Sequence, residues 1–547
     1  MSVAAAVRPF PRARRRQQRW VIARHVARSA WLWAFVWGLV LGLFVIATIQ
    51  AMVKGYPTVQ ERLALAKSMQ AFEILIGQGH RLDTVAGFTS WRLMTTSYII
   101  GAIWAIRTSC GLLRGEEDAG RWELLLAGPT TPRRATIQVL VGLAVALLLM
   151  WAVIALFTLI GGRMAAAHFG VGGSLLESIA LISGAAMFLA IGALASQVSA
   201  TAGQATMLSS VVVGVAYVVR LIADANNSLD WLRWVSPIGW IEELRPLEEP
   251  QLVALVPMVV LIVACCVVSV FLAGRRDLNA SVLRERTGSG GNPRWLRGPV
   301  SLTLRLTRTS SLAWILGTGA WLGIVGSLTH SATGIITASS PAVAATLSRL
   351  GLHQATAGFL GLVFLFAAIG ISLLAATQMV SMRDEESSGR LDNILVRRVP
   401  RMAWLMGRVG VAIAMVVIAG VVSGLFTWIG SANQHTGVGP LKLLEAGLNV
   451  VPPGVFIIGA GTLVFGLRPQ LTGAAVYGIV AWSFLIDLLS ALIKNADWLR
   501  DSSLLTHVQL APGVNPDWGS NAIMVLLGLG LAGLGALAFQ RRDIAYD

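Results

Sequence analysis

The feature that most constrains this chain is a series of apolar runs, each about 20 residues long, the length that a helix needs to cross a ~30 Å hydrocarbon core. Hydrophobic residues make up 55% of the 547 residues and charged residues only 13%, whereas a soluble globular protein carries roughly 25% charged residues. This composition excludes a water-soluble fold. It leaves room for about a dozen transmembrane helices and for no separate soluble domain of ordinary size.

The positions of the apolar runs predict an all-α polytopic membrane protein with about 12 transmembrane helices. Charged or turn-forming segments separate one run from the next. Six runs come before the middle of the chain, at 30–53, 89–113, 135–160, 176–198, 204–223 and 252–273. Six more follow, at 311–328, 357–380, 403–429, 450–465, 472–493 and 522–539.

This order of runs predicts two membrane halves joined by a polar linker. The expected parts are a cytoplasmic basic tail with an amphipathic connecting helix at 1–29, a first half at 30–273, a cytoplasmic linker with a second connecting helix at 274–310, a second half at 311–540, and a cytoplasmic tail at 541–547. The connecting segments 20–28 and 302–308 alternate arginine with apolar residues, which suits a helix lying on the inner leaflet. Ordinary positively charged flanks of the spans explain them nearly as well.

Arginines are concentrated in the N-terminal tail and in the central linker, and this distribution predicts the topology. Positive residues accumulate on the cytoplasmic side of a membrane, so both segments are expected inside. The loop after the fifth run is acidic by contrast, and an even number of crossings returns the C-terminus to the cytoplasm. We therefore predict a multi-pass protein of the plasma (inner) membrane with cytoplasmic termini, in which the net charge of +16 reports topology and not nucleic-acid binding.

Three short motifs occur twice, in one order and at nearly one offset. They are an Arg-x-Glu-Glu-x-x-Gly-Arg segment, an Asp-Trp-Leu-Arg segment and an Arg-Arg-Asp segment. The copies lie at 114–121 and 383–390, at 230–233 and 497–500, and at 275–277 and 541–543. Such agreement is hard to obtain by chance in apolar sequence. It indicates two fused six-helix units that face the same way, related by a pseudo-twofold axis along the membrane normal.

The Glu-Glu motif lies between the second and third spans of each half, on the predicted cytoplasmic side. Its acidic residues accompany an apolar stripe, which suits a short interfacial helix near 114–128 and another near 383–397. Acidic side chains are disfavoured beside anionic lipid headgroups, so we expect a docking surface for a cytoplasmic partner. The alternative is that the acids pair with arginines of the same solvated loops, namely Arg121, Arg133 and Arg134, or Arg390, Arg397 and Arg398.

This segment resembles the coupling helix of the membrane subunit of ABC-2 type exporters. The resemblance rests on an acidic pair, a glycine, a Glu-Leu-Leu run and a following proline, here Glu116, Glu117, Gly120, 123–125 and Pro132. The second copy keeps Glu385, Glu386, Gly389 and Pro400 but departs at Asp392 and Asn393. Ser-Pro-Ile-Gly-Trp at 236–240 resembles the Ser-Pro-x-Gly-Trp element of the family's external loop.

The resemblance extends over both halves and is strongest to the large, internally duplicated permeases of actinobacterial tetronasin-type antibiotic and multidrug efflux systems. It implies an exporter of hydrophobic or amphipathic compounds, such as drugs or antibiotics, that works with two copies of a separately encoded ATP-binding cassette subunit within membrane lipid. It also assigns coupling to the ATPase to Glu116, Glu117, Gly120, Arg121, Glu123, Glu385, Glu386, Gly389, Arg390 and Asp392.

The sequence contains no Gly-x-x-x-x-Gly-Lys-[Ser/Thr] phosphate loop. If ATP drives the process, partner subunits must bind ATP and Mg, and we expect no cofactor and no enzymatic activity in this chain by itself. We predict no catalytic residues. The three cysteines, Cys110, Cys265 and Cys266, lack companions at metal-ligand spacing, so we predict no metal site.

Two ionisable residues in the fifth spans, Arg220 and Asp487, occupy matching positions of the two halves. Ionisable groups inside a membrane are costly and therefore mark a transport path or a structural pair. A charge pair between the halves or a place on the substrate path is one interpretation. The alternative is that each side chain reaches the outer interface by snorkelling.

Two other functions remain open at this point. One is a proton-driven transporter with the same layout, since Asp-Ala-Gly-Arg at 118–121 resembles the loop between the second and third helices of that superfamily, although the usual pattern is broken. The other is a membrane-embedded lipid-linked transferase, which needs acids opposite a phosphate-binding arginine; Glu242, Glu243 and Arg245 have those residue types. The repeated acidic segment argues against a single active site.

Overall fold

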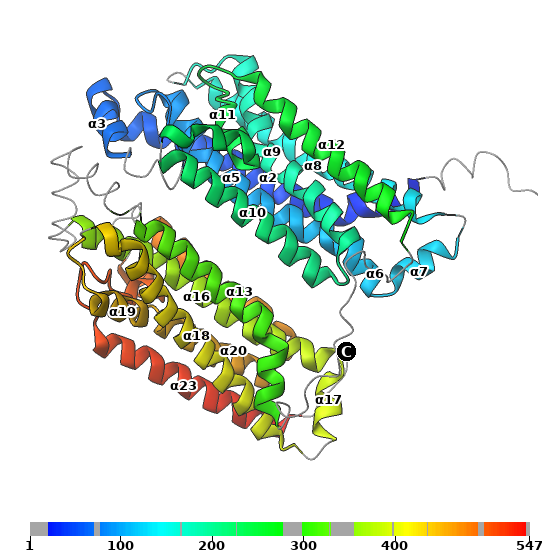
Figure 1. The fold of residues 1–547 in the computed structure, drawn as a ribbon, viewed down its shortest axis with the longest axis vertical. Coiled ribbons are helices and arrows are strands. Elements are labelled where there is room, and N and C mark those ends of the chain that lie inside the picture. Colours follow the sequence, from blue (N-terminus) through cyan, green and yellow to red (C-terminus); the bar gives the residue numbers. More distant parts are fainter. Residues whose placement is uncertain are drawn as a thin grey trace, which may run out of the picture. The chain divides into compact units, whose positions relative to one another are not determined.

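The structure is a computed structural model that describes residues 20–69, 77–128, 130–164, 167–225, 227–276, 298–327, 329, 355–396, 399–434, 436–490 and 497–542. All regular secondary structure in these ranges is helical, which confirms the all-α prediction. The chain divides into two compact units, unit 1 (Met1–Ser289) and unit 2 (Gly290–Asp547). Figure 1 shows both units in the colours of the sequence.

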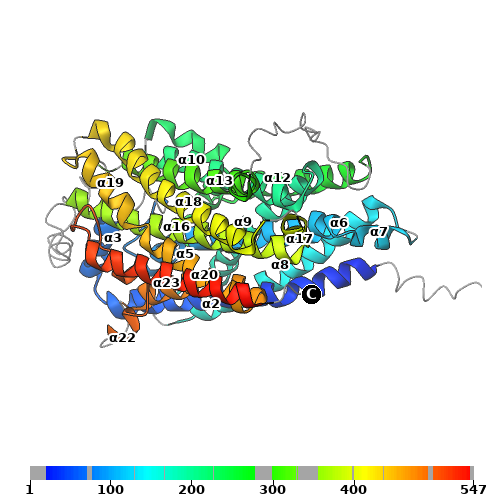
Figure 2. The same ribbon diagram turned by 90° about the horizontal axis from the view of Figure 1, so that it is seen from below.

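The long helices of unit 1 run roughly along one direction (Figures 1 and 2). They are α2 (Val21–Gly55), α5 (Val85–Cys110), α8 (Pro132–Gly162), α9 (Val171–Val198), α10 (Ala202–Ala225) and α12 (Leu255–Ala273). The shorter elements are α3 (Val59–Met69), a π-helical turn η3 (Gly111–Gly115), α6 (Glu116–Asp118), α7 (Arg121–Leu126), η4 (Asn227–Val235), α11 (Pro237–Glu243) and η5 (Leu252–Ala254).

Helix α9 forms the centre of unit 1, since α5, α8, α10 and α12 all pack against it. Its sequence is rich in glycine, alanine and serine, which allows helices to approach closely inside a membrane. A side chain at Gly184 would come within 2.7 Å of Tyr98 on α5. The small residues of α9 therefore place α5, and the coupling segment that follows it, against the core of the unit.

Unit 2 is also a bundle of long helices. They are α13 (Pro299–Ser327), α16 (Ala355–Ser387), α18 (Arg401–Ser431), α20 (Pro452–Leu467), α21 (Thr472–Ser490) and α23 (Trp518–Arg541). The shorter elements are α17 (Arg390–Leu395), η7 (Ala432–Gln434), α19 (Pro440–Asn449), η8 (Pro469–Leu471), α22 (Asp497–Arg500) and η9 (Leu505–His507). Helix α20 packs against α16, α18, α21 and α23, and its Gly459 lies directly on the backbone of Gly528 in α23.

Eleven helices within the described residues are long and apolar enough to cross a membrane, against about twelve predicted spans. The predicted second span, 89–113, forms α5 and is not among them. Helix α5 carries Arg92 and Arg107, which lower its hydropathy, and it packs against α2, α9 and α10. In unit 2 the predicted run 450–465 joins α19 in a single candidate span, Pro440–Leu467.

The predicted connecting segments are helical and run directly into the following spans; their position on the inner leaflet stays a prediction. Residues 21–28 form the first turns of α2, and residues 302–308 belong to α13. No proline or glycine interrupts the chain between Val21 and Trp37, so the amphipathic segment and the first apolar run continue as one helix. The basic tail before residue 20, most of the linker and the last five residues lie outside the described part of the chain.

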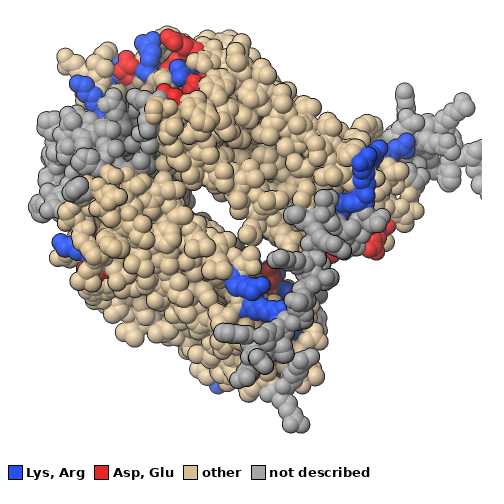
Figure 3. All heavy atoms as spheres, viewed as in Figure 1, with Lys and Arg blue, Asp and Glu red and all other residues tan. Residues whose placement is uncertain are grey.

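Charged side chains lie at the two ends of each unit, and the face in between is formed by other residues (Figure 3). Large apolar side chains in the middle of the long helices are exposed, among them Val145 and Leu148 on α8 and Val260 and Val263 on α12. An exposed apolar belt between charged ends is the pattern expected of helices in contact with hydrocarbon. Each candidate coupling segment lies at one end of the long helices of its own unit (Figure 1).

Candidate functional site

The first candidate coupling segment, residues 114–128, follows directly from α5 without a break; it and its counterpart at 383–397 are called the coupling segments after their predicted role. The π-helical turn Gly111–Gly115 extends α5, and α6 (Glu116–Asp118) extends that turn. The chain then reverses at Gly120, whose φ of 71° lies in the left-handed region that favours glycine. Trp122 of α7 is buried and fixes the short helix against the unit, while Leu124 is 79% exposed.

The second coupling segment turns at its glycine in the same way, although an unbroken α-helix leads into it in place of a π-helical turn. Helix α16 continues through Ser387, so Glu385 and Glu386 lie in its last turns. Gly389 adopts a φ of 68°, and Leu391 of α17 is buried at the position that corresponds to Trp122. The Gly of the shared motif therefore makes the same turn in both units.

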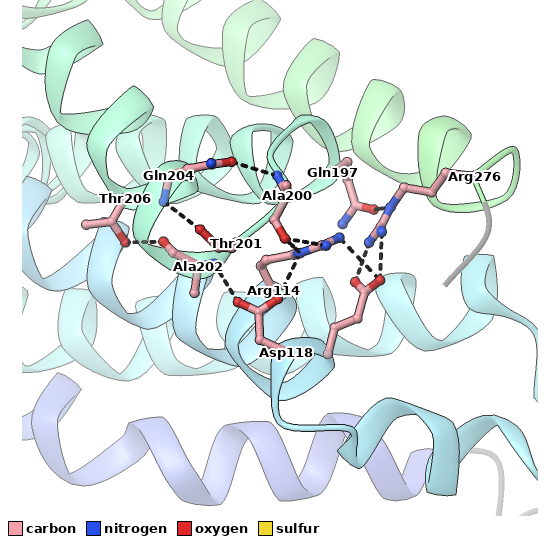
Figure 4. Close-up of polar contacts among 10 residues, drawn as sticks. Arg114, Asp118, Gln197, Ala200, Thr201, Ala202, Gln204, Thr206 and Arg276 are labelled. Carbon is pink, nitrogen blue, oxygen red and sulfur yellow. Dashed lines mark hydrogen bonds and ion pairs between the residues drawn. The ribbon is translucent and has the colours of Figure 1, made fainter. Parts of the chain in front are cut away.

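The polar contacts of the first segment centre on Arg114 (Figure 4). Its Nη1 lies 3.3 Å from Glu117 Oε1, and its Nε donates to Asp118 Oδ1 at 3.1 Å. The same guanidinium donates to the carbonyl oxygen of Ala200, in the turn between α9 and α10. Asp118 in turn accepts a hydrogen bond of 2.7 Å from the backbone N–H of Ala202. These bonds fasten the coupling segment to the α9–α10 turn.

Glu117 also binds the end of the last helix of unit 1. Arg276, which follows α12, donates from Nη1 to Glu117 Oε1 at 2.7 Å, and its Nε donates to Gln197 Oε1 at 3.0 Å. The side chain of Glu117 is 2% exposed and that of Arg276 is 10% exposed. The second glutamate of the motif is thus an internal ion-pair partner in unit 1.

Glu116 behaves differently from its neighbour. It pairs with Arg121, whose Nη2 donates to Glu116 Oε1 at 2.8 Å, and both side chains are partly exposed. The hydrogen bond from Arg121 lowers the pKa of Glu116. This pair is the one that the alternative interpretation predicted within the loop. Glu123 lies exposed on α7.

In unit 2 both glutamates of the motif are buried and paired. Glu385 lies 3.2 Å from Arg408 Nη2 of α18. Glu386 accepts two hydrogen bonds from Arg542 Nη2, at 2.7 Å and 2.8 Å. Arg390 is exposed and donates to Ser388 Oγ.

The structure therefore divides the predicted coupling residues into two groups. Glu117, Glu385 and Glu386 are buried and contact arginines of this chain, so they do not present free carboxylates at the surface. The partly or fully exposed charged residues are Glu116, Arg121, Glu123, Arg390 and Asp392. Their role in coupling stays a prediction. Of the predicted loop arginines, Arg397 and Arg398 lie outside the described residues.

At the other end of unit 1, Arg220 is fully buried and forms ion pairs with Asp224 at 2.8 Å and with Glu242 at 2.7 Å. It therefore does not snorkel to a surface of the unit, because acids close by compensate its charge. In unit 2, Asp487 accepts hydrogen bonds from Thr506 and Ser503. The predicted pairing between Arg220 and Asp487 stays a prediction.

The acids considered for a transferase are also engaged within the chain. Glu243 Oε2 accepts a hydrogen bond of 2.9 Å from Arg245 Nη2. Ser236 of the Ser-Pro-Ile-Gly-Trp element caps α11 by accepting from the N–H groups of Ile238 and Gly239. Its hydroxyl donates to the carbonyl of Ala216 on α10. This element thus has a structural role in joining α10 to α11.

Three arginines at the coupling end were not identified as partners from the sequence, namely Arg276, Arg408 and Arg542. The Arg-Arg-Asp motif that contains Arg276 and Arg542 occurs in both halves, and this repetition is the signal that marked them. Nothing in the sequence joined that motif to the Glu-Glu motif, because 159 residues separate Glu117 from Arg276 and 156 separate Glu386 from Arg542. Arg408 has no matching arginine in the first half, so no repeated motif marks it as a partner of Glu385.

Comparisons with known proteins cover nearly the whole chain. A family model described as ABC-2 family transporter protein matches residues 23–278. A second model, described as the C-terminal domain of the multidrug efflux system permease Rv1217c, matches residues 296–540. The multidrug efflux system permease protein Rv1217c of Mycobacterium tuberculosis (strain ATCC 25618 / H37Rv) is 27% identical over 525 residues, which span 94% of this chain and 92% of that relative.

Proposed function

The chain belongs to the ABC-2 family of transporter proteins as a distant homologue of a multidrug efflux permease, and from this premise we propose that it is the membrane-spanning permease of an ATP-driven exporter. ABC-2 permeases are multi-pass membrane subunits that pair with ATP-binding subunits and are typically not catalytic themselves. The proposal adds that two separately encoded ATP-binding cassette subunits power this chain and that ATP and Mg bind to them alone.

The observation that carries the proposal is the pair of coupling segments. Each follows the second long helix of its unit, turns at a glycine with a positive φ and presents charged side chains next to a buried anchor. A segment that transmits force needs to be a stiff lever joined firmly to its helices. The continuous path from α5 through η3 into α6, and the extension of α16 to Ser387, supply such a lever.

We propose that the chain contains two fused six-helix halves with twelve spans, in which α5 supplies the span missing from the eleven apolar candidates. With 26 residues, α5 has the length to cross a bilayer, which needs about 20. Both termini and both coupling segments then lie in the cytoplasm, in the plasma membrane of the cell. Helices α12 and α23 are each followed by an arginine, which supports the proposal that they end on that same side.

The proposed substrates are hydrophobic or amphipathic compounds, including drugs or antibiotics. The support is the similarity to a multidrug efflux permease across both units. The exposed charges of the coupling segments are proposed to receive the movement of the ATP-binding subunits and to pass it to the halves, which alternate between inward-open and outward-open states.

The test is transport by inverted membrane vesicles that contain this chain with or without the ATP-binding cassette protein encoded beside it. We expect ATP-dependent uptake of a panel of hydrophobic fluorescent dyes only when both proteins are present, and no effect of a protonophore. Uptake that needs no ATP-binding protein and collapses with the proton gradient would show the proton-driven alternative instead.

Charge reversal on the exposed face gives a second test of coupling. Glu116→Lys with Glu123→Lys should abolish dye uptake while the chain still inserts into the membrane, because Glu116 is partly exposed and Glu123 is exposed. A matched control is Asp230→Lys, whose exposed side chain lies beyond α10 at the other end of unit 1. Unchanged uptake in the coupling variant would discredit the docking role.

A further inference from the structure

An ion pair joins the coupling segment to the end of the last helix in both units. In unit 1 it is formed by Glu117 and Arg276, and in unit 2 by Glu386 and Arg542. Glu117 and Glu386 are the same residue of the Glu-Glu motif, and Arg276 and Arg542 are the same residue of the Arg-Arg-Asp motif. Two motifs that recur together in sequence thus make the same contact twice.

Each pair lies in an environment that makes it strong. In unit 1, the guanidinium of Arg276 uses Nη1 and Nη2 for both carboxylate oxygens of Glu117 and Nε for Gln197 on α9. In unit 2, Arg542 Nη2 reaches both oxygens of Glu386, and its guanidinium lies 5.4 Å and 5.6 Å from the ring centroids of Phe465 and Phe539. Charge-assisted hydrogen bonds of this kind are stronger than neutral ones and fix orientation.

Breaking such a pair is costly because it leaves a charge buried without its partner. The four side chains are between 2% and 17% exposed, so water replaces the lost partner poorly. The pair therefore resists separation when the coupling segment is displaced. The surrounding rings of Trp404, Phe465 and Phe539 pack on one another in unit 2 and stiffen the same region.

We propose that Arg276 and Arg542 are positioning residues that fasten each coupling segment to the last helix of its unit, so that α12 and α23 move together with the coupling segments when the ATP-binding subunits close. This inference rests on the proposed function. It adds a direct route to the last helix of each unit, whereas the chain itself leads from the segment only to its neighbours α5 and α8, or α16 and α18.

The test is a spin-label distance measurement within unit 2 of the full chain in complex with its ATP-binding partner. Labels go on cysteines placed at Asn393 in α17 and at Leu537 in α23, both exposed, after the native cysteines are replaced by serine. We expect one narrow distance distribution that stays unchanged when ATP is added. A wild-type distance that changes with ATP would overturn the proposal, because the two elements would then move independently.

The variant that breaks the pair is Arg542→Glu. It should replace the narrow distribution with a broad one and abolish ATP-dependent dye uptake. The charge swap that combines Glu386→Arg with Arg542→Glu should restore a single narrow distribution, and Arg542→Lys should retain it in part because the charge remains. The matched control is Arg541→Ser, which removes an exposed neighbouring arginine and should behave as wild type.

The outcomes separate this inference from the proposed function. A narrow distribution in Arg542→Glu, with dye uptake intact, would overturn the inference and leave ATP-driven transport standing. Should Arg542→Glu fail to insert, Arg542→Lys and the charge swap decide, since loss of the narrow distribution in the swap would also count against the pair. Failure of the proposed function would appear in the vesicle experiment, where the wild-type chain would take up dye without any ATP-binding protein.

The pair in unit 1 offers an independent repetition. Labels at Leu124 in α7 and Val267 in α12, both exposed, should report a fixed distance that Arg276→Glu broadens and that Arg275→Ser does not. A fixed distance in Arg276→Glu would restrict the proposal to unit 2 and so overturn it as stated for both units.

Discussion

The two coupling segments share a motif and a glycine turn but hold their first glutamate differently. In unit 1, Glu116 pairs with Arg121 of the same segment, and the Arg121 side chain is 58% exposed. In unit 2, Glu385 pairs with Arg408 of a neighbouring long helix, and both side chains are at most 4% exposed. The second glutamates, Glu117 and Glu386, make the same contact in both units.

This comparison separates what the motif needs from what it can vary. The glycine turn and the ion pair of the second glutamate hold the segment in place within its unit, and both copies retain them. The first glutamate is partly exposed in unit 1 (Glu116) and buried in unit 2 (Glu385). We expect the first segment to carry most of the electrostatic contact with a partner and the second to be held more firmly within its unit.

The largest expected difference between the units follows from Glu385→Gln. Removing one partner of a buried ion pair destabilises a protein by about 3–5 kcal/mol, because Arg408 would remain buried with its charge uncompensated. The thermal unfolding midpoint of the purified chain should fall clearly. The corresponding change in unit 1, Glu116→Gln, should cost about 1 kcal/mol or less because that pair is partly exposed.

Equal thermal unfolding midpoints for Glu385→Gln and Glu116→Gln would contradict the proposed difference between the two units. Recovery offers a control: combining Glu385→Gln with Arg408→Met removes both charges and should regain much of the lost stability, since apolar replacements of buried ion pairs are well tolerated. A double variant as unstable as Glu385→Gln alone would show that the charge of Arg408 is not the cause.

The sequence was informative about the fold wherever the signal was local. Apolar runs indicate the long helices, and the repeated motif marks Gly120 and Gly389 without predicting their left-handed conformation. The connecting segments have two interpretations from sequence, helices on the inner leaflet or positively charged flanks, and the structure shows only that 21–28 and 302–308 continue as helix into the following spans. Composition indicates which segments suit the membrane interface, but whether a helix continues depends on helix-breaking residues such as proline.

The candidate site was only partly predictable for a different reason. The motifs identified Glu117 and Glu386 by type, but their partners lie more than 150 residues away. Ion pairs at such separation depend on how the helices pack, and one sequence does not reveal that packing. The buried Glu177 of α9, which accepts a hydrogen bond from Ser90, was missed because it interrupts an apolar run and belongs to no repeated motif.

An intermediate effect is expected from the two motif glycines. Gly120→Ala and Gly389→Ala should each destabilise the chain by about 1–2 kcal/mol, because an L-residue is strained in the left-handed region. A Cβ at Gly120 meets no atom within 4 Å, so backbone strain is the whole effect there. Unfolding midpoints should fall by similar amounts in both units, with asparagine tolerated better than alanine; a loss confined to one unit would contradict the shared backbone role.

The smallest effect concerns the opposite end of unit 1, where Glu248 lies beside the start of α5. Burial raises the pKa of Glu248 to about 7, so the folded chain holds a proton that the unfolded chain has already lost. The free energy of unfolding of this end of unit 1 should therefore decrease as pH rises from about 4.5 to about 7 and then stay level. Solvent screening limits the change to roughly 1 kcal/mol or less.

Hydrogen exchange of the amides near Gly87 as a function of pH checks this expectation. Glu248→Gln should remove the dependence between pH 4.5 and pH 7, because the amide does not titrate. Exchange that slows with rising pH, after correction for the intrinsic rate, would reverse the sign and contradict the burial of this carboxyl group.

The most direct measurement is cross-linking between the coupling segments and the ATP-binding protein. Single cysteines at Leu124 and at Asn393, both exposed, should form cross-links to the co-expressed ATP-binding cassette protein, and the link from position 124 should depend on Glu116 and Glu123. A cysteine at Trp498, which is 76% exposed in α22, should form none. Cross-links from Trp498 alone, or from neither coupling segment, would contradict the account.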